Sequence, residues 1–221
     1  MRFSDTLPYF KESVLLRFVL WFGWGFLTKV IDLHFDDKLF RRDLVLFLAV
    51  ICGVSVGLAM ASDGETTILY GAIIASCFLS GKIDNFAFHV STGLVCVCLV
   101  LVQATVGIDL RPTVLAGAAF FLLTLGYVLD EKLNDRMDRP EHQKMAQSPS
   151  RLTRWTYLFL KHRCVSFVCE GTVLLLGAIS FFGIVQAALF NAGYYAMYIV
   201  GKGLMDRRAP SSQRLTSSVV R

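Results

Sequence analysis

The sequence predicts an all-α polytopic integral membrane protein, and three observations support this prediction. Apolar residues make up 55% of the 221-residue chain. Only 18% of its residues are charged, against about 25% in an ordinary soluble domain. Long stretches carry no charged side chain, notably residues 44–62, 85–108 and 171–201, and apolar runs of about 18 residues or more indicate membrane-spanning helices. A disordered chain, a nucleic-acid-binding module and a secreted disulfide scaffold are thereby excluded.

Seven segments are apolar and long enough to cross the cell membrane as a multi-pass helix bundle. We expect these transmembrane helices at residues 14–33, 43–62, 65–81, 86–107, 112–130, 164–182 and 184–203. The first segment is interpreted as a retained helix, because it lacks the basic leader and small-residue cleavage site of a signal peptide. The last two follow from length, since one helix over Cys164–Gly201 would reach about 57 Å, nearly two bilayers. Gly183 is the expected turn between them.

Lysine and arginine are unevenly distributed between the two sides of this bundle. If the amino terminus is outside and the carboxyl terminus inside, all but four of the 22 basic residues fall on the cytoplasmic side. The exceptions are Arg2, Lys11, Arg17 and Arg111. Because membrane proteins keep positive charge on the cytoplasmic side, this distribution favours seven spans over six.

The predicted helices that run from outside to inside end in similar sequences. The endings are FLTKVIDLHFDD, FLSGKIDNFAFH, TLGYVLDEKLND and AMYIVGKGLMD. Three of them place an Asp one turn beyond a Gly, Lys or Tyr, which favours one helix followed by three tandem helix hairpins. A simpler interpretation is that all four are interfacial helix caps, with lysine suited to a helix carboxyl end. Both interpretations stay open.

We expect residues 1–205 to form the transmembrane bundle and residues 206–221 a basic, disordered tail. The cytoplasmic loop at 131–163 belongs to the bundle and is its one sizeable polar segment. Within this loop, residues 151–163 place three apolar side chains on one helical face with basic residues around them. These are Leu152, Trp155 and Phe159. The pattern predicts an amphipathic helix in the headgroup plane of the inner leaflet. Expected partners are membrane lipids, above all the anionic inner leaflet; a homo-oligomer is left open.

Acidic residues gather directly after the fifth span, in two rows that recur every four residues on a helix. The rows are Asp130, Asn134 and Asp138, with Glu131 and Asp135 beside them. Like charges at this spacing repel unless a cation lies between them, and Mg²⁺ completed by substrate phosphate oxygens would serve. Asp130, Asp135 and Asp138 are therefore candidate catalytic residues and magnesium ligands that would stabilise a leaving pyrophosphate. A salt-bridged helix extension ending at Pro140 explains the same pattern without a metal.

The segment Asn134–Pro140 resembles the N-D-x-x-D motif, with its nearby Arg-Pro, of the UbiA-type intramembrane prenyltransferases. Asp32-x-x-x-Asp36-Asp37 resembles their second motif, D-x-x-x-D. The resemblance is confined to these two segments, and the chain differs from the family at His142, in motif order and in length. It implies acids that bind Mg²⁺ and a prenyl diphosphate at a lipid-open cavity, which adds Asp32 and Asp36 to the candidate metal ligands.

A second polar group lies at the end of the first span and on the next inner loop. Its members are Lys29, Asp32, His34, Asp36, Asp37, Lys82, Asp84 and His89. Lys29 and Asp32 are three residues apart and can pair. The acids and histidines could coordinate a transition metal or relay protons, or the histidines could bond headgroups or backbone. Candidate residues for a substrate phosphate are Lys29, Lys82, Arg139 and Lys202.

Glu170 lies about 9 Å into the sixth span, where an ionisable side chain indicates function by default. It can pair with Lys161, Arg163 or Lys202. Without such a pair, its neutral form is favoured and it could carry a proton.

Three functions therefore remain. The first is a Mg²⁺-dependent inner-leaflet enzyme acting on a prenyl or lipid phosphate. The second is a transporter of a small solute, a metal ion or protons. The third is a non-catalytic structural or assembly protein of the membrane.

Overall fold

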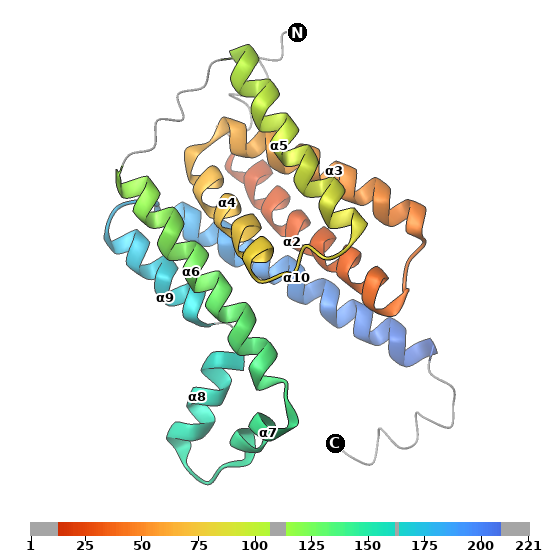
Figure 1. Cartoon of the computed structure of the whole chain (residues 1–221), viewed down its shortest axis with the longest axis vertical. Helices are drawn as coiled ribbons and strands as arrows, with labels where there is room; N and C mark the ends of the chain where they lie inside the picture. Colours follow the sequence, from red (N-terminus) through yellow and green to blue (C-terminus); the bar gives the residue numbers. More distant parts are fainter. Residues whose placement is uncertain (1–12, 107–113, 162–163, 209–221) are drawn as a thin grey trace. The chain divides into compact units, whose positions relative to one another are not determined.

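The computed structural model describes residues 13–106, 114–161 and 164–208, and the regular secondary structure in these ranges consists of helices alone (Figure 1). A helix occupies each of the seven segments predicted to cross the membrane. These helices are α2 (Val14–Asp37), α3 (Arg42–Ser62), α4 (Gly64–Leu79), α5 (Phe86–Val106), α6 (Val114–Met137), α9 (Cys164–Leu175) and α10 (Phe181–Arg208). Among the described residues, α2, α3 and α6 are long and apolar enough to cross a membrane, whereas α4 and α9 are apolar but shorter.

Local sequence signals explain where several helices begin and end. Ser13 caps α2 by accepting a hydrogen bond from the backbone N–H of Leu16 at 3.3 Å, and Asp63 caps α4 through Thr66 at 2.9 Å. At its other end α2 is closed by Lys38, whose φ of 54° is left-handed. The backbone N–H of Lys38 donates to the carbonyl of His34 at 2.9 Å, so that the last turn stays bonded.

The turn between the last two apolar helices differs from the prediction. Gly183 was expected at the turn, but it lies inside α10. The chain turns instead after Leu175, where Gly177 has a φ of 70° that L side chains rarely adopt. Ser180 then precedes α10, and the Glu65 carboxylate of α4 accepts both the backbone N–H and the hydroxyl of Ser180, at 2.9 and 2.8 Å. A glycine conformation and a distant carboxylate therefore set the position of this turn.

The polar loop after α6 contains two short helices, α7 (Pro140–Gln143) and the 3₁₀ helix η1 (Lys144–Gln147), followed by α8 (Arg151–Lys161). The predicted amphipathic helix is thus confirmed as a helix as far as Lys161; residues 162–163 lie outside the described ranges. The backbone N–H of Thr153 donates to the Ser150 hydroxyl at 3.4 Å at the start of α8. At the far end of the chain, α10 continues to Arg208, three residues into the predicted tail, and residues 209–221 lie outside the description.

The described helices divide into two compact units. Unit 1 comprises the described residues up to Gly57, with Asn85–Cys98 and the chain from Gln186. Unit 2 comprises Leu58–Asp84 and Leu99–Val185. Each predicted hairpin therefore contributes most of one helix to unit 1 and most of the other to unit 2.

Close backbone contacts and a buried apolar cluster organise unit 1. A side chain at Gly25 would collide with the backbone of Phe190 on α10. A Cβ at Gly53 would lie 2.5 Å from the carbonyl oxygen of Ser91, and one at Gly57 would lie 2.6 Å from Cys98 Cβ. Small residues therefore let α3 approach α5, as is usual between membrane helices. The cluster contains Val30, Ile31, Leu33, Leu39, Val45, Ala49, Ala87 and Met197.

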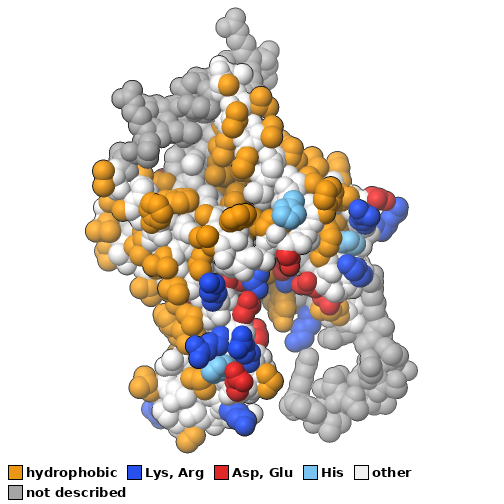
Figure 2. Space-filling model, in the orientation of Figure 1, with side chains coloured by type: hydrophobic (Ala, Val, Ile, Leu, Met, Phe, Trp, Pro, Cys, Tyr) orange, Lys and Arg blue, Asp and Glu red, His pale blue; other side chains and the backbone are white. Residues whose placement is uncertain are grey.

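Unit 2 is built around α6, which packs against α4 on one side and α9 on the other, while α8 packs on α6 and α9 (Figure 1). Gly126 permits the close approach of α9, since a Cβ there would lie 2.7 Å from Cys169 Sγ. Figure 2 shows hydrophobic side chains along the upper part of this unit and charged side chains gathered around the lower end of α6 and on the α7–α8 segment. This arrangement brings the acidic residues of α6 next to α8 and the start of α9.

Candidate functional site

The first acidic row of α6 binds the connection between α8 and α9. Asp130 is 2% exposed, and its two carboxylate oxygens accept the backbone N–H groups of Val165 and Ser166 at 2.9 and 2.7 Å. These N–H groups belong to the first turn of α9 and have no acceptor within that helix. A carboxylate at the amino end of a helix also interacts favourably with the helix dipole. Asp130 therefore caps α9 from a neighbouring helix.

The two remaining residues of this row bind the end of α8. Asn134 donates from Nδ2 to the backbone carbonyl of Lys161 at 2.6 Å, and Lys161 Nζ forms an ion pair with Asp138. We refer to Asn134, Asp138 and Lys161 as the α8 lock. Because a main-chain bond and a side-chain ion pair meet at one residue, the lock holds the carboxyl end of α8 against α6.

The second acidic row is paired with a lysine from the loop after α4. Lys82 Nζ lies 3.0 and 2.9 Å from the two carboxylate oxygens of Asp135 and 3.9 Å from Glu131 Oε2. Asp135 and Lys82 remain 56% and 41% exposed, so that water screens their attraction. The repulsion within the acidic rows is thus relieved by Lys82 and Lys161.

The candidate magnesium ligands occupy separate surroundings. Asp32 and Asp36 are on α2 in unit 1, whereas the other three are on α6 in unit 2, each with different partners. Within the described residues, no group of three or more His, Cys, Asp or Glu side chains could hold a metal ion. A magnesium site therefore stays a prediction of the sequence.

A buried lysine, an aspartate and a tyrosine form a closed ring of contacts in unit 1, which we call the lysine site. Lys29 Nζ lies 2.8 Å from Asp32 Oδ2 and donates to the Tyr194 hydroxyl at 3.3 Å. The Tyr194 hydroxyl donates to the same Asp32 oxygen at 2.9 Å. Lys29 also lies 4.9 and 5.7 Å from the ring centres of Tyr194 and Tyr198, a favourable cation–π geometry. The predicted Lys29–Asp32 pair is confirmed, and two tyrosines of α10 add to it.

The remaining candidate residues are placed as follows. His34 is buried, and its Nδ1 lies 2.7 Å from the backbone carbonyl of Phe40. A carbonyl oxygen only accepts, so this nitrogen donates the hydrogen bond, and the bond holds the segment after α2 against the helix. His89 is exposed at the start of α5. Arg139 and Lys202, both candidates for a substrate phosphate, are exposed on different units.

Glu170 is the most deeply buried carboxylate of the described chain, at 1% exposure, and it lies on α9 facing α6. Its Oε1 accepts a hydrogen bond from the Tyr127 hydroxyl at 2.9 Å, whereas its buried Oε2 has no hydrogen-bond partner among the described residues. Of the three possible partners Lys161, Arg163 and Lys202, Lys161 forms its ion pair with Asp138 instead. Arg163 lies outside the described residues. We call Tyr127 and Glu170 the glutamate site.

Sequence reasoning missed Tyr127. A tyrosine within an apolar span is a usable signal, because a buried hydroxyl needs a partner. Tyr127 also precedes Asp130 by three residues and so shares its helix face. On α9, Ser166 precedes Glu170 by four residues and is 4% exposed. Four polar side chains therefore meet at one helix interface: Tyr127, Asp130, Ser166 and Glu170.

No known protein family, no characterised protein and no solved structure matches this chain. The geometry of its own residues is therefore the basis for any functional conclusion.

Proposed function

We propose that the chain is a multi-pass protein of the cell membrane that carries protons across the bilayer, and that Glu170 binds and releases them. The proposal includes the topology expected from the charge distribution, with seven spans, the amino terminus outside and the carboxyl terminus inside. Three helices long and apolar enough to cross a membrane support the assignment to this class of protein.

One observation carries the proposal: Glu170 is buried, and only one of its two carboxylate oxygens is hydrogen-bonded to a residue that the structure describes. An ionised carboxylate in that position leaves charge on an oxygen that no donor contacts, which is costly in a low-dielectric interior. Protonation of Oε2 removes that charge, while Tyr127 keeps its bond to the other oxygen. Ionisable residues within membrane helices commonly mark proton pathways.

The neighbouring polar groups support a role in proton movement. Ser166 lies one helical turn before Glu170, and its backbone N–H binds Asp130. The polar groups thus form a series along α9. It begins at the amino end of the helix, where Asp130 binds, and passes Ser166 to Glu170, about 9 Å farther along the helix axis. The carboxylates of α6, unlike Glu170 on α9, are engaged by lysines or backbone groups.

The test measures proton entry into liposomes that contain the purified full-length chain and a pH-sensitive dye, driven by a potassium diffusion potential. We expect the chain to acidify the lumen faster than protein-free liposomes do, and Glu170→Gln to reduce the rate to the protein-free level. Tyr127→Phe removes one hydrogen bond but keeps the carboxyl, so that a smaller reduction is expected.

Glu65→Gln is the matched control. Glu65 is also a membrane-helix carboxylate, but both of its oxygens accept hydrogen bonds from Ser180. This variant should retain the unmodified rate. Equal rates for the unmodified chain and protein-free liposomes, or for the unmodified chain and Glu170→Gln, would refute the proposal and favour a structural or assembly function.

A further inference from the structure

The helix α8 leaves its apolar side uncovered by the described residues of its own unit. Leu152 is 77% exposed, Trp155 69% and Phe159 41%, and no residue of α8 is buried. At 3.6 residues per turn these three side chains lie within an arc of about 60°. Such exposed apolar clusters mark a surface that binds a membrane or another protein.

The opposite side of α8 is the one that packs on the rest of unit 2, namely α6 and α9. Thr153, Tyr157 and Leu160 are half-buried and lie roughly across the helix from Trp155. The α8 lock holds the carboxyl end of the helix to α6 through Asn134 and Asp138. The packing of these three side chains and the α8 lock therefore determine which face of α8 is left uncovered.

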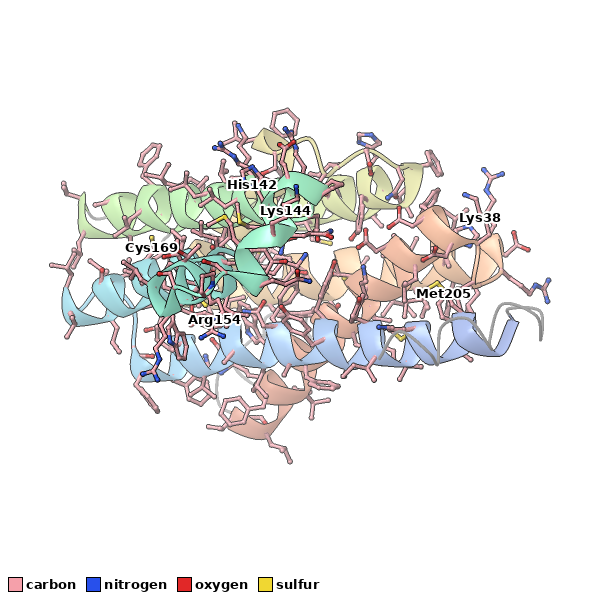
Figure 3. The ribbon with its side chains drawn as sticks, turned by 90° about the horizontal axis from the view of Figure 1, so that it is seen from below. Lys38, His142, Lys144, Arg154, Cys169 and Met205 are labelled. Atoms are coloured by element: carbon pink, nitrogen blue, oxygen red, sulfur yellow. The ribbon has the colours of Figure 1, made fainter. Side chains whose placement is uncertain are left out.

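Positively charged side chains lie beside the uncovered face of α8. Arg151 and Arg154 are exposed and lie beyond one edge of the apolar arc, and Lys144 is exposed on η1 just before α8 (Figure 3). The chain contains no Asp or Glu between His142 and Lys161. Exposed apolar side chains bordered by arginines are complementary to a lipid surface with anionic headgroups. Tryptophan is also enriched at the boundary between lipid and water.

We propose that α8 docks on an anionic lipid surface, with Leu152, Trp155 and Phe159 inserted among the lipids and Arg151 and Arg154 bound to lipid phosphates. The α8 lock fixes the helix in the orientation that this docking requires. The proposal is independent of proton transport by Glu170, because it rests on a different element and on surface exposure.

The test compares backbone hydrogen exchange of residues 151–161 in the full-length chain, embedded in nanodiscs that hold one copy each. The discs contain either phosphatidylcholine alone or phosphatidylcholine with phosphatidylglycerol. We expect exchange to be slower by about tenfold in the anionic discs, since docking suppresses local opening of the helix.

Two variants separate the parts of the surface. Arg151→Gln combined with Arg154→Gln should abolish the difference between the two lipids, and Leu152→Ser combined with Phe159→Ser should abolish the slowing in the anionic discs. Lys132→Gln removes an exposed positive charge of α6 and is the control that should leave the difference unchanged.

Two results would overturn the proposal. Equal exchange in neutral and anionic discs for the unmodified chain would show that anionic lipid is not the partner. Slowing that occurs only in preparations with several copies per disc would show instead that a second copy covers the face.

Discussion

The lysine site of unit 1 and the glutamate site of unit 2 contain the same pair of groups but differ in what surrounds it. In each, a tyrosine hydroxyl donates to a carboxylate of another helix at 2.9 Å. In the lysine site the ammonium group of Lys29 completes the arrangement, so that each of the three groups contacts the other two. In the glutamate site, none of the residues in the described ranges gives Oε2 of Glu170 a hydrogen bond.

This difference separates a structural role from a chemical one. A partly buried carboxylate that is paired and hydrogen-bonded, as Asp32 is, is stabilised in its charged form and joins two helices. A buried carboxylate with one unsatisfied oxygen gains from binding a proton and can release it again when a base approaches. We therefore expect substitutions in the lysine site to change stability, and substitutions in the glutamate site to change proton transport.

The largest effect on stability is expected when the lysine site is broken. Lys29→Met removes the partner of a partly buried carboxylate and should lower the free energy of unfolding by about 3 kcal/mol. Thermal unfolding of the purified chain in detergent measures this loss. The double variant Lys29→Met/Asp32→Asn should recover part of it, because the uncompensated charge is gone. A single variant as stable as the unmodified chain would contradict a structural lysine site.

A smaller loss of stability is expected at Asp130, which borders the glutamate site. Asp130→Ala leaves two backbone N–H groups of α9 without their acceptor and should cost about 2 kcal/mol, as for other lost helix caps. Hydrogen exchange of Val165 and Ser166 should accelerate together with the loss. Unchanged exchange at these two positions would show that the cap contributes little to holding α9.

The smallest change in stability is expected in the glutamate site itself. Glu170→Gln replaces a half-satisfied carboxyl by a neutral amide of similar shape, so that stability should change by no more than about 1 kcal/mol. The same unfolding measurement serves as a check, with Lys29→Met as the reference for a large effect. A loss as large as that of Lys29→Met would mean that Glu170 is structural and that the two sites do not differ in kind.

Much of the helical architecture is predictable because its causes are local. Each apolar segment contains a helix, because a helix satisfies its backbone hydrogen bonds within the segment and apolar runs of this length favour it. The pair of Lys29 and Asp32 follows from a spacing of three residues on one helix. The exposed face formed by Leu152, Trp155 and Phe159 likewise follows from helical periodicity.

The errors of prediction have a common cause in long-range contacts. The turn was expected at Gly183, but the conformation of Gly177 and the bonds from Ser180 to Glu65 place it earlier. Glu170 was given Lys161, Arg163 or Lys202 as possible partners, and of these Lys161 instead binds Asp138. In each case a residue distant in sequence contributes to the outcome, and periodicity contains no information about that residue.

The sequence by itself determined the helical class of the protein, the positions of its apolar segments and the amphipathic face of α8, because composition and spacing along one helix govern these features. Only the tertiary structure decided which residues neutralise the acids of α6 and which carboxylate remains half-satisfied. Lys82 and Asp135 are 53 positions apart in the chain, and Tyr127 and Glu170 are 43 apart. Hydrogen bonds act over about 3 Å, so that such partners are chosen by how helices pack and rotate against each other.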